Sequence, residues 1–232
     1  MRHWVCAGPC LPVPLTIVIA LRQTVGALSD ELYPSTNLQP GYNIAPTEDV
    51  MFCHLDRDGR RELDTGRWWL VPHWAKEMPK AAMFNARMET VGTAPAFRDA
   101  FKWRRCLIPA DGYFEWTTSP VDGKKDPWLI QLPNGRPFSF AGLWAKNDTL
   151  GITSCSIITA PATPQIDHIH VRMPVIMEDE FYRAWLDPQT SLAEATGLLL
   201  DHHLDGQLVF DRVGRAVNSS RYMGEDTKKP IV

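Results

Sequence analysis

The chain has 232 residues, of which 44% are hydrophobic and 22% are charged, and these ordinary values exclude long disorder, collagen-like repeats and coiled coil. Its 24 Lys and Arg against 27 Asp and Glu give a formal net charge of −3. That balance excludes a surface that is basic throughout, and it leaves a local basic patch open. Nine Trp and nineteen Pro indicate a loop-rich β protein lined with aromatic side chains.

The N-terminal segment, residues 1–20, differs in character from residues 21–232, which we treat as one domain. Arg2 and the apolar stretch from Trp4 to Leu21 resemble a signal peptide, but prolines interrupt the stretch. It is also too short and broken for a membrane span, so we expect no membrane association. The alternative is a core-facing segment, and apolar residues at helical spacing predict a helix from about Leu15 to Leu28.

Short strands dominate the rest of the chain. An extended loop over Ser35–Pro46 precedes a hairpin of two strands, Val50–His54 and Gly66–Val71, with a turn at Asp58-Gly59. Further strands are predicted at 106–108, 112–116, 128–132, 138–144, 152–159 and 208–210, with turns at 122–123 and 134–135 and helices at 178–186 and 191–200. This pattern favours a single α+β domain with an antiparallel or mixed, barrel-like β core flanked by helices.

Five cysteines stand at positions 6, 10, 53, 106 and 155. An odd and scattered set favours neither a disulfide framework nor a zinc site, since no second ligand pair follows Cys6 and Cys10. We therefore expect a reducing, cytoplasmic location and no metal or other cofactor.

Two clusters place polar residues in apolar surroundings. Asn85, Arg87 and Glu89 alternate, so they share one face of an extended segment, which is either a solvated face or a functional one. Glu115 lies between two large aromatic residues. If it points inward, burial raises its pKa and makes it a general acid, whereas an outward Glu115 is ordinary surface.

Two further clusters contain histidines and cations. His168 and His170 would share a face on a strand, but no partner ligand is spaced to complete a metal site. Acid–base work by one histidine is the better functional interpretation, and an ordinary core or surface role is the default for a lone histidine. In Phe97–Arg105, basic residues alternate with aromatic ones. That composition suits single-stranded nucleic acid, and it equally suits a helix with a solvated face and core aromatics.

Taken in order, these segments resemble the SRAP family, the SOS response-associated peptidases. The resemblance rests on stretches between residues 42 and 220: YNIAP at 42–46, VPHW at 71–74, NARMET at 85–90, DGYFEW at 111–116, HVRMP at 170–174 and VNS at 217–219. Each motif is weak alone, and the ordered set is specific.

The resemblance implies a single α+β domain that recognises abasic sites in single-stranded DNA and crosslinks to them. In the family, a cysteine at position two becomes N-terminal, its amine forms a Schiff base with the sugar aldehyde, and its thiol closes a thiazolidine. The same resemblance makes Glu115 the catalytic acid and His170 the proton shuttle, while Asn85 orients the N-terminal group. Peptidase and lyase activities are implied as well.

The DNA contacts implied by the resemblance, together with the basic run, form a longer set. Arg87 would hold phosphate, and Trp74 and Pro46 would shape the DNA cleft. The full set of candidate DNA-binding residues is Pro46, Trp74, Arg87, Arg98, Arg104, Arg105, Trp116 and Arg172. We expect a monomer whose partner is single-stranded DNA.

The chain departs from the family at its start, because position two is Arg2 and not cysteine. Our hypothesis is initiation at Val5, which would make Cys6 the second residue and, after methionine removal, the catalytic nucleophile. A frameshift within the first 20 residues is another explanation, as is a cleaved, secreted form. If Cys6 never gains a free amine, the chain is a non-catalytic DNA-binding module.

Overall fold

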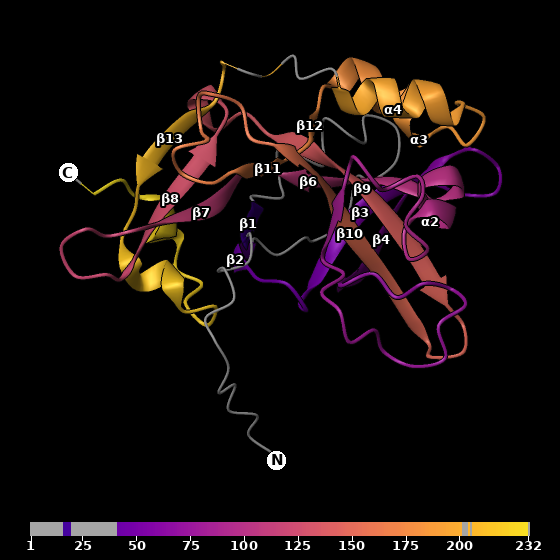
Figure 1. The fold of residues 1–232 in the computed structure, drawn as a ribbon, viewed down its shortest axis with the longest axis horizontal. Helices are drawn as coiled ribbons and strands as arrows, with labels where there is room; N and C mark the ends of the chain where they lie inside the picture. Colours follow the sequence, from indigo (N-terminus) through magenta and orange to yellow (C-terminus); the bar gives the residue numbers. More distant parts are fainter. Residues whose placement is uncertain (1–15, 20–40, 201–203, 205, 232) are drawn as a thin grey trace.

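The computed structural model describes residues 16–19, 41–200, 204 and 206–231, and over these residues the fold has two sheets and three short α-helices (Figure 1). This architecture confirms a single α+β domain with a mixed sheet. Among the described residues, no helix is long and apolar enough to cross a membrane.

The first sheet is antiparallel and joins both ends of the chain. Its strand order is β13-β8-β7-β1-β2. The bounds are Thr16–Ile19 for β1, Gly41–Ile44 for β2, Gly112–Thr118 for β7, Lys125–Gln131 for β8 and Val209–Arg212 for β13. Strand β1, which lies within residues 1–20, is therefore directly beside the strand that carries Glu115.

The second sheet has eight strands in the order β11-β10-β4-β3-β6-β9-β12, with β5 also paired to β10. It is mixed, because β10 runs parallel to β4 and β5 and antiparallel to β9 and β11. The bounds are Asp49–Leu55 for β3, Arg61–Trp68 for β4, Asn85–Arg87 for β5, Arg105–Ala110 for β6, Phe138–Asn147 for β9, Ile152–Pro161 for β10, Arg172–Pro174 for β11 and Ile176–Met177 for β12.

The helices flank the second sheet. They are α2 (Arg98–Trp103), α3 (Tyr182–Leu186) and α4 (Leu192–Leu200), and 3-10 turns span 133–135, 179–181, 215–218 and 225–228. A reciprocal cap begins α4: Ser191 Oγ accepts from the Glu194 backbone N–H, and Glu194 accepts from the Ser191 backbone N–H.

Apolar burial divides the core into layers. One cluster joins both sheets and includes Phe52, Tyr113 and Phe140, all fully buried. A second cluster, with Phe101 and Trp185, packs the eight-stranded sheet against the helices. Burial of large aromatic side chains in both layers supplies the main stabilisation of the fold.

Three sequence predictions about local structure were wrong. The helix expected from Leu15 is a strand over Thr16–Ile19, because β-branched residues there pair with both β2 and β7; residues 20–28 lie outside the described residues. The loop expected through Pro46 contains strand β2. His168 and His170 belong to a turn rather than a strand, since the backbone N–H of His170 donates to the Ile166 carbonyl.

Candidate functional site

Glu115 is a buried carboxyl at the centre of β7. Alternation along the strand sends Tyr113 and Glu115 toward the core between the sheets, while Phe114 and Trp116 face a separate apolar cluster. Glu115 is only 5% exposed. Burial raises the pKa of Glu115 to about 8, and the backbone N–H of Trp116 offsets only part of that rise. The carboxyl therefore holds a proton at neutral pH and is able to donate it.

His170 links this buried acid to the solvent. Its Nδ1 lies 3.7 Å from Glu115 Oε1 and 2.8 Å from the carbonyl oxygen of Arg172. The backbone N–H of Arg172 lies 3.2 Å from the same Nδ1, so this nitrogen donates to the carbonyl in one tautomer and accepts from the N–H in the other. Because the His170 side chain is 37% exposed, the pair forms a route for protons between a buried carboxyl and the surface.

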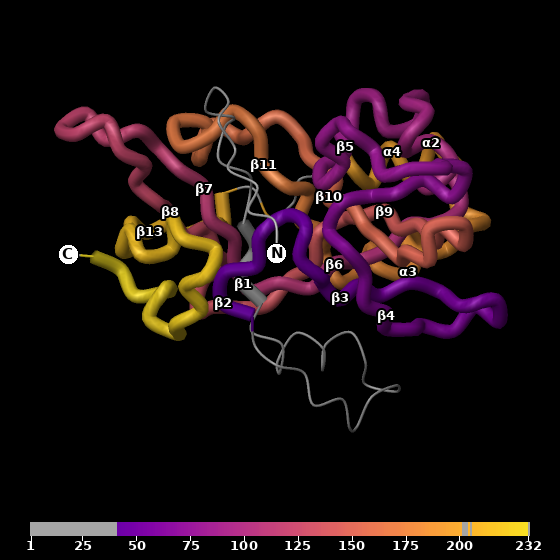
Figure 2. Tube along the Cα trace, turned by 90° about the horizontal axis from the view of Figure 1, so that it is seen from below, coloured from indigo at the N-terminus to yellow at the C-terminus, as the bar shows by residue number. Residues whose placement is uncertain are grey.

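Arg172 fastens the histidine segment to the Asn85 segment. Its guanidinium donates to both carboxylate oxygens of Glu89, at 2.8 and 3.0 Å, and to the carbonyl of Thr159 at 2.7 Å. The Arg172 side chain lowers the pKa of Glu89 through these hydrogen bonds. In Figure 2 the segment leading into β11 lies between β7 and β10, so three distant sequence motifs meet at one place.

The short strand β5 contributes two polar side chains, Asn85 and Arg87, near the contacts that join Glu115, His170 and Arg172. Asn85 pairs with Ile157 and Arg87 with Thr159 on β10. Within the described residues, the buried Asn85 Oδ1 has no hydrogen-bond partner. A buried amide oxygen without a donor is costly, so this atom is a natural acceptor for an N–H group from a ligand or another segment. Arg87 is exposed and free to approach a phosphate.

Two predicted DNA-binding residues are buried elsewhere. Arg105 is 3% exposed, and its guanidinium donates to main-chain carbonyls, including those of Phe101 and Trp185, so it fastens α2 to α3. Trp116 is 7% exposed on the face of β7 opposite Glu115, and its Nε1 donates to Asn218 Oδ1 at 2.7 Å. We therefore leave both out of the DNA surface.

Four more of the predicted DNA-binding residues lie away from the contacts that join Glu115, His170 and Arg172. Trp74 is 54% exposed and lines an open pocket of about 350 Å³ with Met78 and Met83. Pro46 is half-buried at the end of β2. Arg98 is exposed, and Arg104 lies over the Trp144 ring at 5.6 Å. They lie in the segment after β2, in the loop that follows β4 and at α2.

Sequence reasoning missed two features of the site. Thr159 holds Arg172 from β10, yet nothing in an apolar, β-branched strand marks that threonine as a partner. Trp128 stands directly opposite Glu115, and the strand register that reveals this pairing depends on the Asp122-Gly123 turn. Cys6 lies outside the described residues. Within them, no group of three or more His, Cys, Asp or Glu is arranged to hold a metal.

A family model, SOS response associated peptidase (SRAP), matches residues 18–220. The chain therefore belongs to the SRAP family.

Similar proteins agree with this assignment. The chain is 37% identical over 198 residues to "Abasic site processing protein YoaM" of Bacillus subtilis, covering 83% of this chain and 86% of the relative. It is 29% identical to YedK of Escherichia coli, which also carries the name abasic site processing protein, with coverage of 82% and 84%. A solved structure from Bordetella bronchiseptica has a TM-score of 0.72 at 27% identity, with coverage of 86% and 99%.

Proposed function

We propose that this protein processes abasic sites in DNA by crosslinking covalently to them in single strands, through Cys6 exposed as the N-terminal residue. The observation that carries the proposal is the buried Glu115 carboxyl 3.7 Å from His170, where burial raises the pKa of the carboxyl. The names of the relatives supply the substrate class, and the pair supplies the proton transfers that such chemistry needs.

The chemistry is a sequence of proton transfers around one carbon atom. Glu115 donates its proton to the ring oxygen as the C1′–O4′ bond breaks, and the C1′ hydroxyl gives its proton to His170, which leaves the aldehyde. The N-terminal amine adds to C1′, and the carbinolamine loses water to give the imine. The thiol then adds to the imine carbon, its proton passes to the nitrogen, and a thiazolidine forms. His170 carries protons between Glu115 and solvent through both steps.

The placement of β1 supports a role for the N-terminal segment. Thr16 pairs with Phe114, one residue from Glu115, so the described chain begins beside the acid. Cys6 is ten residues earlier, and an extended chain of that length spans at most about 35 Å. The amide oxygen of Asn85 is the acceptor that would orient the new amine, and Arg87 would hold an adjacent phosphate. Self-processing peptidase and lyase activities would use the same groups.

The test is a denaturing gel of the protein mixed with single-stranded DNA that carries one abasic site. Three forms run side by side: the chain initiated at Val5, the chain initiated at Met1, and Cys6→Ala in the Val5 form. A heat-stable shifted band only with the free Cys6 amine supports the proposal. Absence of a band in every lane, with binding retained in a native gel, identifies a non-catalytic DNA-binding module.

Glu115→Gln separates chemistry from binding. It removes the transferable proton and keeps the shape, so crosslinking should slow by about 100-fold or more while binding is retained. Glu180→Gln, an exposed change in the 3-10 turn before α3, is the matched control. Equal loss of binding and crosslinking would make Glu115 a structural residue.

A further inference from the structure

One face of the β7–β8–β13 sheet carries aromatic and cationic side chains next to Glu115. Glu115 pairs with Trp128, and Trp128 pairs in turn with Arg212 on β13. Directly opposed residues of neighbouring antiparallel strands point to the same face, with Cβ atoms about 5 Å apart. Glu115, Trp128 and Arg212 therefore form a row across three strands.

Two more rings extend this row. Trp128 lies 6.1 Å from Phe210 and 6.4 Å from His168, and His168 lies 5.4 Å from Phe210, all measured between ring centroids. His168 is exposed, and it stands two residues before His170, which contacts Glu115. We call Trp128, His168, Phe210 and Arg212 the β8 strip. It begins beside the acid and ends in solvent.

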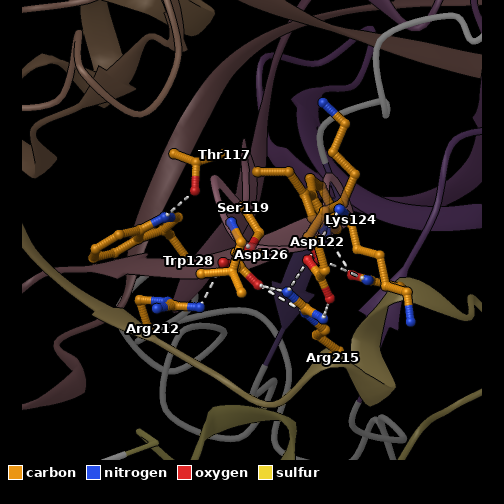
Figure 3. A network of polar contacts seen from close by, with 12 residues as sticks. Thr117, Ser119, Asp122, Lys124, Asp126, Trp128, Arg212 and Arg215 are labelled. Carbon is orange, nitrogen blue, oxygen red and sulfur yellow. Dashed lines mark hydrogen bonds and ion pairs between the residues drawn. The ribbon is translucent and has the colours of Figure 1, made fainter.

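Hydrogen bonds and ion pairs hold the strip in place. Trp128 Nε1 donates to Thr117 Oγ1 at 3.0 Å, and Arg212, whose side chain is 44% exposed, lies 2.6 Å from the buried Asp126 (Figure 3). Arg215 binds Asp126 as well, and also Asp122 in the β7–β8 turn. The ring and the cation are thus positioned before any ligand arrives, which reduces the entropy lost on binding.

We propose that the β8 strip binds the nucleotide next to the abasic one, with its base against the aromatic rings and its phosphate near Arg212. The inference rests on the proposed function, since it assumes the abasic sugar at Glu115. An abasic nucleotide offers no base to recognise, so affinity has to come from its neighbours. Proteins bind single-stranded DNA with aromatic rings that stack on the bases and with cations that contact the phosphates. One stacked base contributes about 5- to 150-fold in affinity.

The test measures noncovalent binding to oligonucleotides that carry tetrahydrofuran, an abasic analogue with no aldehyde. One oligonucleotide keeps both flanking bases, a second lacks the 5′ base and a third lacks the 3′ base. We expect wild type to lose at least about fivefold in affinity for one of the two shortened ligands. Trp128→Leu should lose the same factor with the complete ligand and lose nothing further when that base is removed.

Controls distinguish stacking from a general defect. Trp103→Leu removes an exposed ring on α2 and should keep the full preference for the flanking base. His168→Ala removes an exposed strip residue with little cost to folding, and it should reduce the preference. Arg212→Gln should reduce the slope of log affinity against log salt by about 0.7.

Two results would overturn the proposal. One is a wild-type affinity that stays the same when either flanking base is removed, and the other is a Trp128→Leu protein that keeps the wild-type preference for the flanking base. Neither depends on crosslinking, because the analogue cannot form an imine. Failure of the β8 strip and failure of the covalent chemistry are therefore separate outcomes, one read from the binding series and the other from the denaturing gel.

Discussion

The raised pKa of Glu115 makes the stability of the protein depend on pH in a way that one substitution removes. In the unfolded chain the carboxyl titrates near 4.5, and in the fold it titrates near 8. Between these values the native state keeps a proton that the unfolded state has lost, so unfolding free energy falls as pH rises. From about pH 5.5 to about pH 7.5, linkage gives a loss of roughly 2 to 3 kcal/mol from this group alone.

Glu115→Gln mimics the protonated carboxyl and cannot ionise, so it removes that loss. The assay is urea unfolding of both proteins across this pH range, taking the difference between wild type and variant so that all other titrations cancel. We expect wild type to lose roughly 2 to 3 kcal/mol relative to the variant as pH rises. A difference constant to within about 0.5 kcal/mol would show that Glu115 is ionised in the native protein, which would refute its role as a proton donor.

Three other measurements test different parts of the structure. If cationic side chains of the protein neutralise three DNA phosphates, DNA affinity should fall about twentyfold between about 50 and about 200 mM salt. An affinity that does not change with salt would exclude a phosphate-binding surface on the protein. Arg105→Met should cost roughly 3 kcal/mol in urea unfolding by orphaning buried carbonyls, and a cost below about 1 kcal/mol would contradict the contacts described. Burial raises the pKa of the Cys53, Cys106 and Cys155 thiols, so iodoacetamide at neutral pH should leave them unmodified until denaturant is added, as intact mass can show.

Local patterns predicted most strands, because alternation and turn residues are encoded within a few positions of one another. The Asp58-Gly59 turn is an example: Gly59 has φ +76, and β3 and β4 pair on either side of it. The inward direction of Glu115 was only one of two alternatives from sequence, since either face of β7 fits the pattern. In the structure both faces of β7 are buried from Gly112 to Trp116, so Glu115 is not a surface residue.

Long-range partners account for what sequence reasoning missed. The helix predicted from Leu15 had correct apolar spacing, but pairing with β2 and β7 prevailed over local periodicity. Arg105 resembled a phosphate ligand in a basic run, and its actual partners are backbone carbonyls, including those of Phe101 nearby and of Trp185, 80 residues away. A cation in a sequence pattern does not reveal whether its counterpart is solvent, DNA or a distant backbone atom.

The contacts of Asn43 have a consequence for how the protein is made. Its side-chain amide on β2 donates to the carbonyls of Val217, Ser219 and Tyr222, and β13 closes the other edge of the same sheet. These partners stand more than 170 residues after Asn43, so β2, the strand beside β1, is secured only when the 217–222 segment has been made and has folded back onto it. A chain truncated before residue 217 would therefore lack the contacts that fix this edge of the sheet.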